Sequence, residues 1–143
     1  MLAAGQAAAV VEAKTGTEYA DTIIVPTDSG DVVLADRYYC SYFLIALLMA
    51  KGVDVVFQQH ATRKTDFRTG QKLSARDHVA AWQKPKLMPE WMTPSQYESI
   101  PNEINMREVK AGNRILVTTL LSDKVASKTA LHELYKQRWH VEL

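Results

Sequence analysis

The chain has 143 residues, a formal net charge of +1 and 47% apolar residues, values typical of one ordinary soluble globular domain and unlike those of a disordered or collagenous chain. Its longest apolar run, Phe43 to Ala50, has eight residues and is too short to cross a membrane, and the alanine-rich N-terminus lacks the basic start of a signal peptide. The single cysteine, Cys40, excludes an internal disulfide and a cysteine-based zinc cluster, so we expect a cytoplasmic protein without membrane contacts.

The first half of the chain predicts a strand–helix–strand unit. Residues 10–11 can end a strand, and the short apolar run 31–35, which follows a glycine turn, predicts a strand buried on both faces. Residues 39–51 contain no Gly or Pro and stop at Gly52, which favours a mostly buried helix. Residues 53–58 predict the next strand. Strand, helix and strand with short links indicate a right-handed crossover, and therefore an α/β fold.

The second half predicts a β-rich region followed by a helix. Strands are expected at residues 78–82, 103–110 and 114–121, the last two separated by a hairpin-like Ala-Gly-Asn link. Thr93-Pro94-Ser95 indicates a short helical turn. From about residue 124 to residue 143 the chain has no Gly or Pro and an apolar spacing near 3.6, which predicts a final helix.

The near-neutral total charge hides an uneven distribution. Residues 1–60 carry three basic and seven acidic side chains, residues 61–90 seven and three, and residues 91–143 seven and six, giving balances of −4, +4 and +1. The total therefore argues against a uniformly basic DNA-binding protein, but the basic middle could face phosphates. The alternative is a solvated loop or edge hairpin, since Lys and Arg also protect strand edges.

Asp36 is the first candidate for chemistry. It follows the predicted buried strand and precedes a helix, and ligand-binding side chains in open α/β sheets lie at such strand ends. A charge there is solvated in a crevice, paired with a basic neighbour or bound to a metal ion. The alternative is a helix-capping or turn residue, which is a common role for Asp at this place.

The final helix holds the second candidate. Tyr135, Arg138 and Glu142 share one stripe with Leu131 and Leu134, so this face should be buried. Charges on a buried face are costly unless they are paired or engaged with a ligand. Arg138 and Glu142 could form a structural ion pair. Alternatively, Glu142 presents a carboxylate across a groove while Arg138 and Tyr135 hold phosphate oxygens.

Several other catalytic patterns are missing from the sequence. The four histidines form no metal-ligand spacing, Cys40 is not flanked by the glycines of a nucleophile elbow, and no phosphate-binding loop of the P-loop type occurs. None of these patterns therefore adds a candidate site to Asp36 and the final helix.

Two segments, in this order, resemble bacterial insertion-sequence transposases of the DDE superfamily. Residues 30–43, GDVVLADRYYCSYF, resemble the segment that carries the second catalytic Asp. Residues 135–143, YKQRWHVEL, resemble the signature Y-x2-R-x3-E-x6-K up to its Glu. The stretches VDVVFQQHATRKTDFRTG and ILVTTLL also look like this family, and the resemblance runs from about residue 15 to the last residue.

The resemblance implies an α/β fold of the ribonuclease H-like kind, a mixed sheet with flanking helices and a β-rich insertion between its last strand and last helix. Residues 1–58 and 124–143 would form the core, and about 59–123 the insertion, of a single partial catalytic domain spanning 1–143. The family's first catalytic Asp and its signature Lys have no match in the chain. We therefore expect a fragment, incomplete at both ends and inactive alone.

The resemblance also implies the roles of individual residues. Asp36 and Glu142 match the second and third metal-binding carboxylates, and Tyr135 and Arg138 match positions expected to contact DNA or to order the site. Two Mg²⁺ (or Mn²⁺) ions held by such carboxylates activate the attacking oxygen and stabilise both oxygens of an in-line phosphoryl displacement. The residues expected to contact DNA from the basic middle are Arg63, Lys64 and Arg68.

The implied partner is double-stranded DNA at transposon ends. The resemblance also implies that the intact transposase can form a homo-oligomer. Two alternatives stay open. The first is a non-enzymatic DNA-binding remnant or an inhibitor of transposition, and the second is a ribonuclease H-like nuclease unrelated to transposition.

Overall fold

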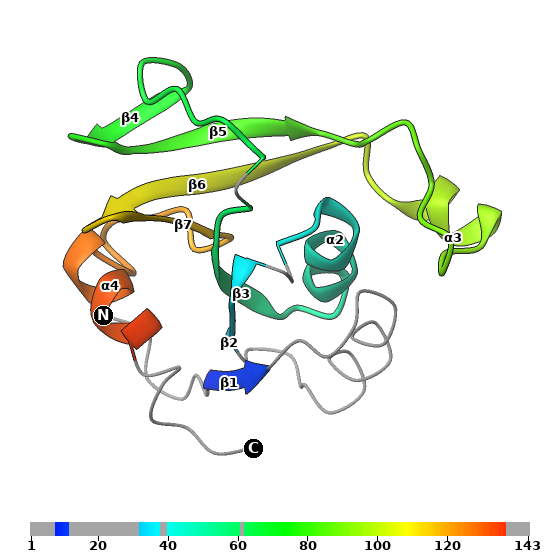
Figure 1. The fold of residues 1–143 in the computed structure, drawn as a ribbon, viewed down its shortest axis with the longest axis horizontal. Coiled ribbons are helices and arrows are strands. Elements are labelled where there is room, and N and C mark those ends of the chain that lie inside the picture. Colours follow the sequence, from blue (N-terminus) through cyan, green and yellow to red (C-terminus); the bar gives the residue numbers. More distant parts are fainter. Residues whose placement is uncertain (1–7, 12–31, 38–39, 61, 137–143) are drawn as a thin grey trace.

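One mixed sheet organises the computed structural model, which describes residues 8–11, 32–37, 40–60 and 62–136 (Figure 1). Within these residues the helices are α2 (Tyr42–Ala50), α3 (Pro94–Ser99) and α4 (Lys128–Lys136). The strands are β1 (Ala8–Val11), β2 (Val32–Ala35), β3 (Asp54–Gln58), β4 (Gln71–Ser74), β5 (Asp77–Gln83), β6 (Glu103–Ala111) and β7 (Arg114–Thr118). None of the described helices is long and apolar enough to span a membrane.

The strand order is β1-β2-β3-β7-β6-β5-β4. The first three strands are parallel to one another, whereas β3–β7, β7–β6, β6–β5 and β5–β4 are antiparallel pairs. The strands of the β-rich region therefore continue the same sheet, because β7 pairs directly with β3. The α/β class and the mixed sheet are confirmed, and the ribonuclease H-like assignment stays a prediction.

The buried strand–helix–strand unit is confirmed. All four residues of β2 are fully buried, as expected of a strand covered on both faces. Helix α2 is apolar along most of its surface, with buried side chains on nearly all sides. It begins three residues later than expected, after Ser41, and ends where the chain reaches Gly52 with φ of +75°.

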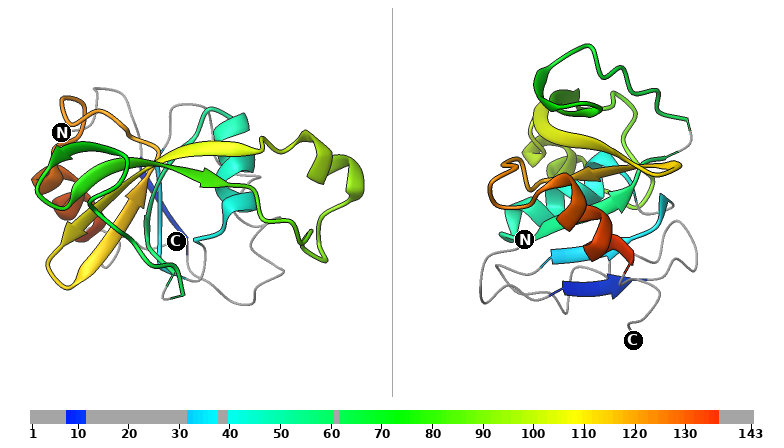
Figure 2. Two further views of the ribbon diagram at one scale, coloured as in Figure 1. Left: turned by 90° about the horizontal axis from the view of Figure 1, so that it is seen from above. Right: turned by 90° about the vertical axis from the view of Figure 1, so that its left-hand side faces the viewer.

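Two apolar cores lie on the two faces of the sheet. Alternate residues of β2 and β3 divide between them: Val33 and Phe57 pack with α2, whereas Leu34 and Val56 pack beneath α4. Figure 1 shows α2 and α4 on either side of β3, and Figure 2 gives two further views of the same layers.

The predicted elements of the second half are also found, with changed ends. The turn at Thr93 is helix α3, with a capping box between Thr93 and Gln96. Strand β7 ends at Thr118, whose hydroxyl accepts a hydrogen bond from the backbone N–H of Leu120. The final helix begins at Lys128, after Ser127, whose hydroxyl accepts from the backbone N–H of Ala130. Strand β4 was not expected from the sequence.

Candidate functional site

Asp36 lies at the carboxyl end of β2, directly after the last strand residue, and is half-buried. The parallel register pairs Ala35 with Phe57, so the end of β2 and the end of β3 lie at the same edge of the sheet. The segment that leaves β3 therefore starts beside Asp36. This segment, residues 59–69, carries three of the basic residues that the sequence analysis singled out.

A surface cavity of about 520 Å³ lies at this edge, and the described residues that line it are Cys40, His60, Thr62, Arg63 and Lys64. The Arg63 guanidinium lies 3.7 Å from the centroid of the Trp82 ring, a stacking contact that holds the cation against the sheet. His60 accepts a hydrogen bond at Nδ1 from the backbone N–H of Thr62, at 3.2 Å, which leaves Nε2 to carry the ring proton. The structure thus places both Arg63 and Lys64 in the lining of this cavity.

The lining of this cavity favours an anion. The described side chains that line it include those of Arg63 and Lys64 and no carboxylate. Burial raises the pKa of the Cys40 thiol to about 11, although a hydrogen bond from the His60 backbone and the charge of Arg63 oppose this rise. The thiol is therefore neutral at physiological pH and adds no negative charge. Such a set of donors suits phosphate oxygens.

Arg68 is in a different situation. Its Nε and one terminal nitrogen bind the two carboxylate oxygens of Asp66 at 2.9 and 3.0 Å, and its side chain is 90% exposed. The hydrogen bonds from Arg68 hold the pKa of the Asp66 carboxyl at about 2. Arg68 is therefore a charge already shared with a carboxylate, and it lies outside the cavity lining.

Helix α4 contains Tyr135, the first residue of the segment that resembles the family signature, so we call it the signature helix; it is described as far as Lys136. Tyr135 is fully buried in the core beneath α4, and the Arg114 guanidinium lies 5.9 Å from its ring centroid. A buried ring can order the helix but presents no surface to DNA. Arg138 and Glu142 lie outside the described residues, and among the described residues no group of three or more His, Cys, Asp or Glu side chains could hold a metal ion.

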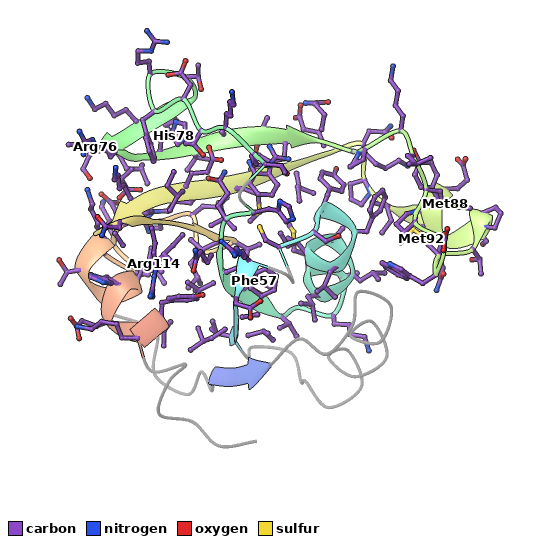
Figure 3. All side chains as sticks on the ribbon, viewed as in Figure 1. Phe57, Arg76, His78, Met88, Met92 and Arg114 are labelled. Carbon is purple, nitrogen blue, oxygen red and sulfur yellow. The ribbon has the colours of Figure 1, made fainter. Side chains whose placement is uncertain are left out.

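Two buried pairs of ionisable side chains were not predicted from the sequence. Nε2 of His78 lies 2.6 Å from Oε1 of Glu108, and Arg107 binds both carboxylate oxygens of Asp77 at 2.9 and 2.8 Å. The spacing of His78 in the sequence does not predict a metal site, so the sequence does not single it out. The available signal was the Arg-Glu dipeptide between Met106 and Val109, in the middle of a predicted strand. Figure 3 shows His78 on β5, within the antiparallel part of the sheet.

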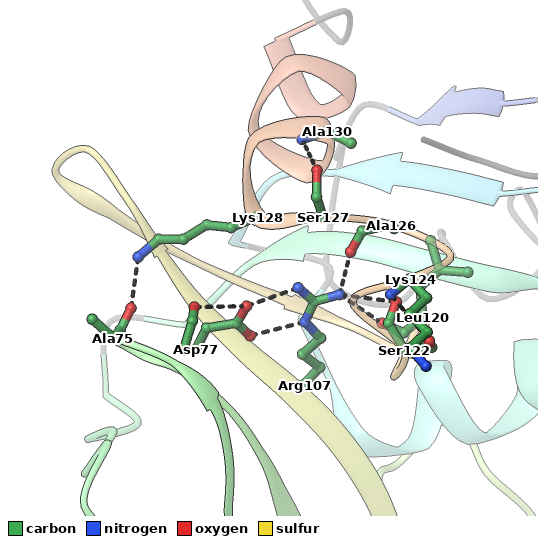
Figure 4. Close-up of polar contacts among 11 residues, drawn as sticks. Ala75, Asp77, Arg107, Leu120, Ser122, Lys124, Ala126, Ser127, Lys128 and Ala130 are labelled. Atoms are coloured by element: carbon green, nitrogen blue, oxygen red, sulfur yellow. Dashed lines mark hydrogen bonds and ion pairs between the residues drawn. The ribbon is translucent and has the colours of Figure 1, made fainter.

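Arg107 also ties the sheet to the segment that precedes α4. Its remaining terminal nitrogen donates to the backbone carbonyls of Leu120, Ser122 and Ala126 (Figure 4). The side chain is completely buried, and its charge is matched by Asp77 and by these carbonyl dipoles. Arg107 is thus a structural residue that positions the start of the signature helix.

The Glu108–His78 pair lies on the opposite face of β6, toward the basic segment. Gln59 donates from Nε2 to Glu108 at 2.9 Å, and the Thr65 hydroxyl lies within hydrogen-bonding distance of both Gln59 and Glu108, at 2.7 and 3.2 Å. The chain leading through the cavity is therefore attached to the sheet by side chains buried beneath it.

A family model described as a transposase DDE domain matches residues 6–143 of the chain. No curated protein and no solved structure matches the chain.

Proposed function

Because the chain belongs to the transposase DDE domain family, we propose that it takes part in metal-dependent cleavage and transfer of DNA strands at transposon ends. DNA transposition, DNA binding and the use of divalent metal ions are general properties of this family. The observation that carries the proposal is the position of Asp36 at the same sheet edge as a cavity lined by Arg63 and Lys64.

The DNA contact is assigned to the cavity and the segment around it. Arg63 and Lys64 would neutralise backbone phosphates, with Arg63 already oriented by Trp82. Arg68 would contribute less to DNA binding, because its guanidinium already forms an ion pair with Asp66. Backbone contacts of this kind position a duplex without reading its sequence, so end recognition would have to come from other contacts.

The metal ions, Mg²⁺ or Mn²⁺, would be held by Asp36 and Glu142. Asp36 fits this role in its chemistry and place, since it is an oxygen donor at the carboxyl end of a buried strand. When bound, the ions would supply an activated oxygen nucleophile and stabilise the leaving oxygen. Tyr135 would order the signature helix from the core, and Arg138 would hold phosphate oxygens.

The remaining parts of the proposal follow the resemblance. We assign the chain to the insertion-sequence transposases of bacteria, with a ribonuclease H-like fold, a cytoplasmic location and association with the nucleoid when bound to DNA. The intact transposase would act on paired transposon ends, for which a homo-oligomer is one suitable assembly.

DNA binding by the chain tests the proposal. Binding of a labelled duplex should weaken as salt rises, and the double variant Arg63→Gln, Lys64→Gln should lower the slope of log affinity against log salt by roughly 1.8, about 0.9 for each lost phosphate contact. The matched control is Lys51→Gln, Lys124→Gln, which removes the same charge from exposed sites outside the cavity lining. Equal effects of the two double variants would reject the assigned interface.

A DNA-binding protein without catalysis is the second candidate. It is favoured by the cavity itself, whose basic lining does not include Asp36 and so could hold DNA without a metal ion. We expect the chain alone to bind DNA but not to cut it, since only Asp36 and Glu142 match the family's metal carboxylates. Nicking of a transposon-end duplex with Mn²⁺ that disappears in Asp36→Ala would contradict this expectation and establish catalysis.

A further inference from the structure

The basic segment 59–69 rests on one buried pair of side chains. His78 and Glu108 are 1% and 4% exposed, occupy directly opposite positions of β5 and β6, and approach to 2.6 Å. Buried charged side chains are expensive unless their hydrogen bonds are satisfied, and neither residue belongs to the cavity lining. We therefore consider which segment of the chain these two side chains hold in place.

Four positions of the segment converge on this pair. Gln59 donates to Glu108 at 2.9 Å, and the Thr65 hydroxyl bridges Gln59 and Glu108. The backbone carbonyl of Thr69 accepts from Nδ1 of His78 at 2.6 Å, and the Phe67 ring packs 5.0 Å from the imidazole, centroid to centroid. The segment is thus attached at its beginning, its middle and its end.

The spacing of these attachments brackets the basic residues. Arg63 and Lys64 lie between the attachments at Gln59 and Thr65, and Arg68 lies between Thr65 and Thr69. A loop closed at both ends has fewer conformations to lose when its cations meet phosphates, so attachment raises affinity by pre-organisation.

Every polar atom of the pair is used. Since the Thr69 carbonyl can only accept, Nδ1 of His78 is the donor of that hydrogen bond. The other ring nitrogen, Nε2, lies 2.6 Å from Oε1 of Glu108. The other Glu108 oxygen accepts from Gln59 and Thr65. Loss of Glu108 would leave the Gln59 amide and the imidazole unsatisfied in a buried place, which favours release of the segment.

We infer that Glu108 and His78 are positioning residues for DNA binding: the pair clamps segment 59–69 to the sheet and so places Arg63 and Lys64 for phosphate contact. The DNA part of this inference rests on the proposed function. The attachment itself does not, and it can be measured without DNA.

Limited trypsin digestion of the folded chain measures the attachment. Glu108→Ala should increase the rate of cleavage after Arg63 and Lys64 by at least about 10-fold, because local opening exposes the backbone to the protease. Glu108→Gln should stay close to wild type. A glutamine can donate to Nε2 of neutral His78 and accept from Gln59 and Thr65, so it rescues the network without a charge.

Asp77→Ala is the matched control. It breaks the other buried pair on the same two strands, but its partner Arg107 is tied to residues 120–126 and not to the basic segment. We expect it to lower stability without increasing cleavage at Arg63 and Lys64, when all variants are digested at a temperature at which they are folded. The duplex affinity of Glu108→Ala should fall roughly 10-fold, and that of Asp77→Ala should not change.

A milder variant covers the case in which Glu108→Ala does not fold. Thr65→Val keeps the shape of the side chain but removes its hydroxyl from Gln59 and Glu108. Its control is Thr69→Val, whose hydroxyl bonds only the Asp66 carbonyl within the segment. Thr65→Val should show increased cleavage and weaker DNA binding, and Thr69→Val neither.

Unchanged cleavage in both Glu108→Ala and Thr65→Val would overturn the clamp, and equal cleavage in Asp77→Ala would reduce the pair to a merely structural role. Increased cleavage with unchanged DNA affinity would reject the positioning role. If the wild-type chain itself bound no duplex at low salt, the proposed function would fail, while the cleavage data would still decide whether the clamp exists.

Discussion

Arg107 and Glu108 follow one another on β6, so their side chains leave the sheet on opposite faces. Both are buried, and each meets an oppositely charged or titratable partner from β5. The two pairs have different consequences because different segments cover the two faces. Arg107 holds the approach to α4, whereas Glu108 holds the basic segment. Two adjacent residues thus position both the start of α4 and the candidate DNA interface.

Cys40 offers a residue-level prediction with a defined pH dependence. Its thiol pKa is raised from 9.0 to about 11, so at pH 8 the folded chain should react with iodoacetamide roughly 100-fold more slowly than the urea-unfolded chain, since only the thiolate reacts. By linkage, the free energy of unfolding should fall as pH rises from about 9 toward 11, because the unfolded thiol ionises first.

Mass spectrometry of the alkylated chain measures this rate directly, because Cys40 is the only cysteine in the chain. A folded-state rate at pH 8 equal to the unfolded rate would show that the thiol is not buried beside the cavity. Slower alkylation of Cys40 in the presence of added duplex would instead report DNA binding at the cavity, which is a separate observation.

At the scale of elements, the basic segment passes directly into the β4–β5 hairpin. Gly70 joins the two, with φ of +73°, and a Cβ atom added there would lie 2.3 Å from the backbone oxygen of Val79. Strand β4 at the edge of the sheet was not expected, since residues 71–74 are mostly exposed and show no apolar alternation. Its pairing with β5 depends on the close approach that Gly70 permits.

Gly70→Ala and Gly112→Ala test this approach as a matched pair. Both glycines have positive φ, so each substitution should cost about 1 kcal/mol of unfolding free energy for the left-handed backbone. Gly112 has nothing within 4 Å of an added Cβ, whereas Gly70 meets backbone. Gly70→Ala should therefore be clearly the more destabilising in urea unfolding, and equal losses would contradict the close contact.

At the scale of the whole molecule, the sheet runs without interruption from β1 to β4. The β-rich region supplies β7, which pairs with β3, and Met106 and Val117 of its strands belong to the same core as Phe57. An insertion joined in this way cannot expose its core residues without opening the core around β3. Region 59–123 is therefore better described as an extension of the sheet than as an appended unit.

Urea unfolding should accordingly follow a single cooperative transition. In a Trp139→Phe variant, tryptophan fluorescence reports only on Trp82 and Trp91 in the β-rich region. This fluorescence and far-ultraviolet circular dichroism, which reports on the whole chain, should give coincident curves. An earlier fluorescence transition would mean that the β-rich region unfolds by itself, in conflict with the shared core.

Local signals explain which features could be predicted. The strand at residues 31–35, the helix that stops before Gly52 and the capped turn at Thr93 all depend on neighbouring residues, and all three are found. Strand ends were less well predicted, as in β7, because a side-chain contact at Thr118 ends the strand while the apolar pattern continues.

The features of the candidate site also divide into local ones, which could be predicted, and long-range contacts, which could not. The sequence by itself determined that Asp36 ends a buried strand and that positive charge concentrates in residues 61–90, because burial pattern and charge are properties of adjacent residues. Only the tertiary structure decided that Cys40 and Arg63 line one cavity and that Glu108 contacts His78. The physical reason is that these contacts depend on which strands pair and in which register, and pairing between residues 30 positions apart leaves no mark on either segment alone.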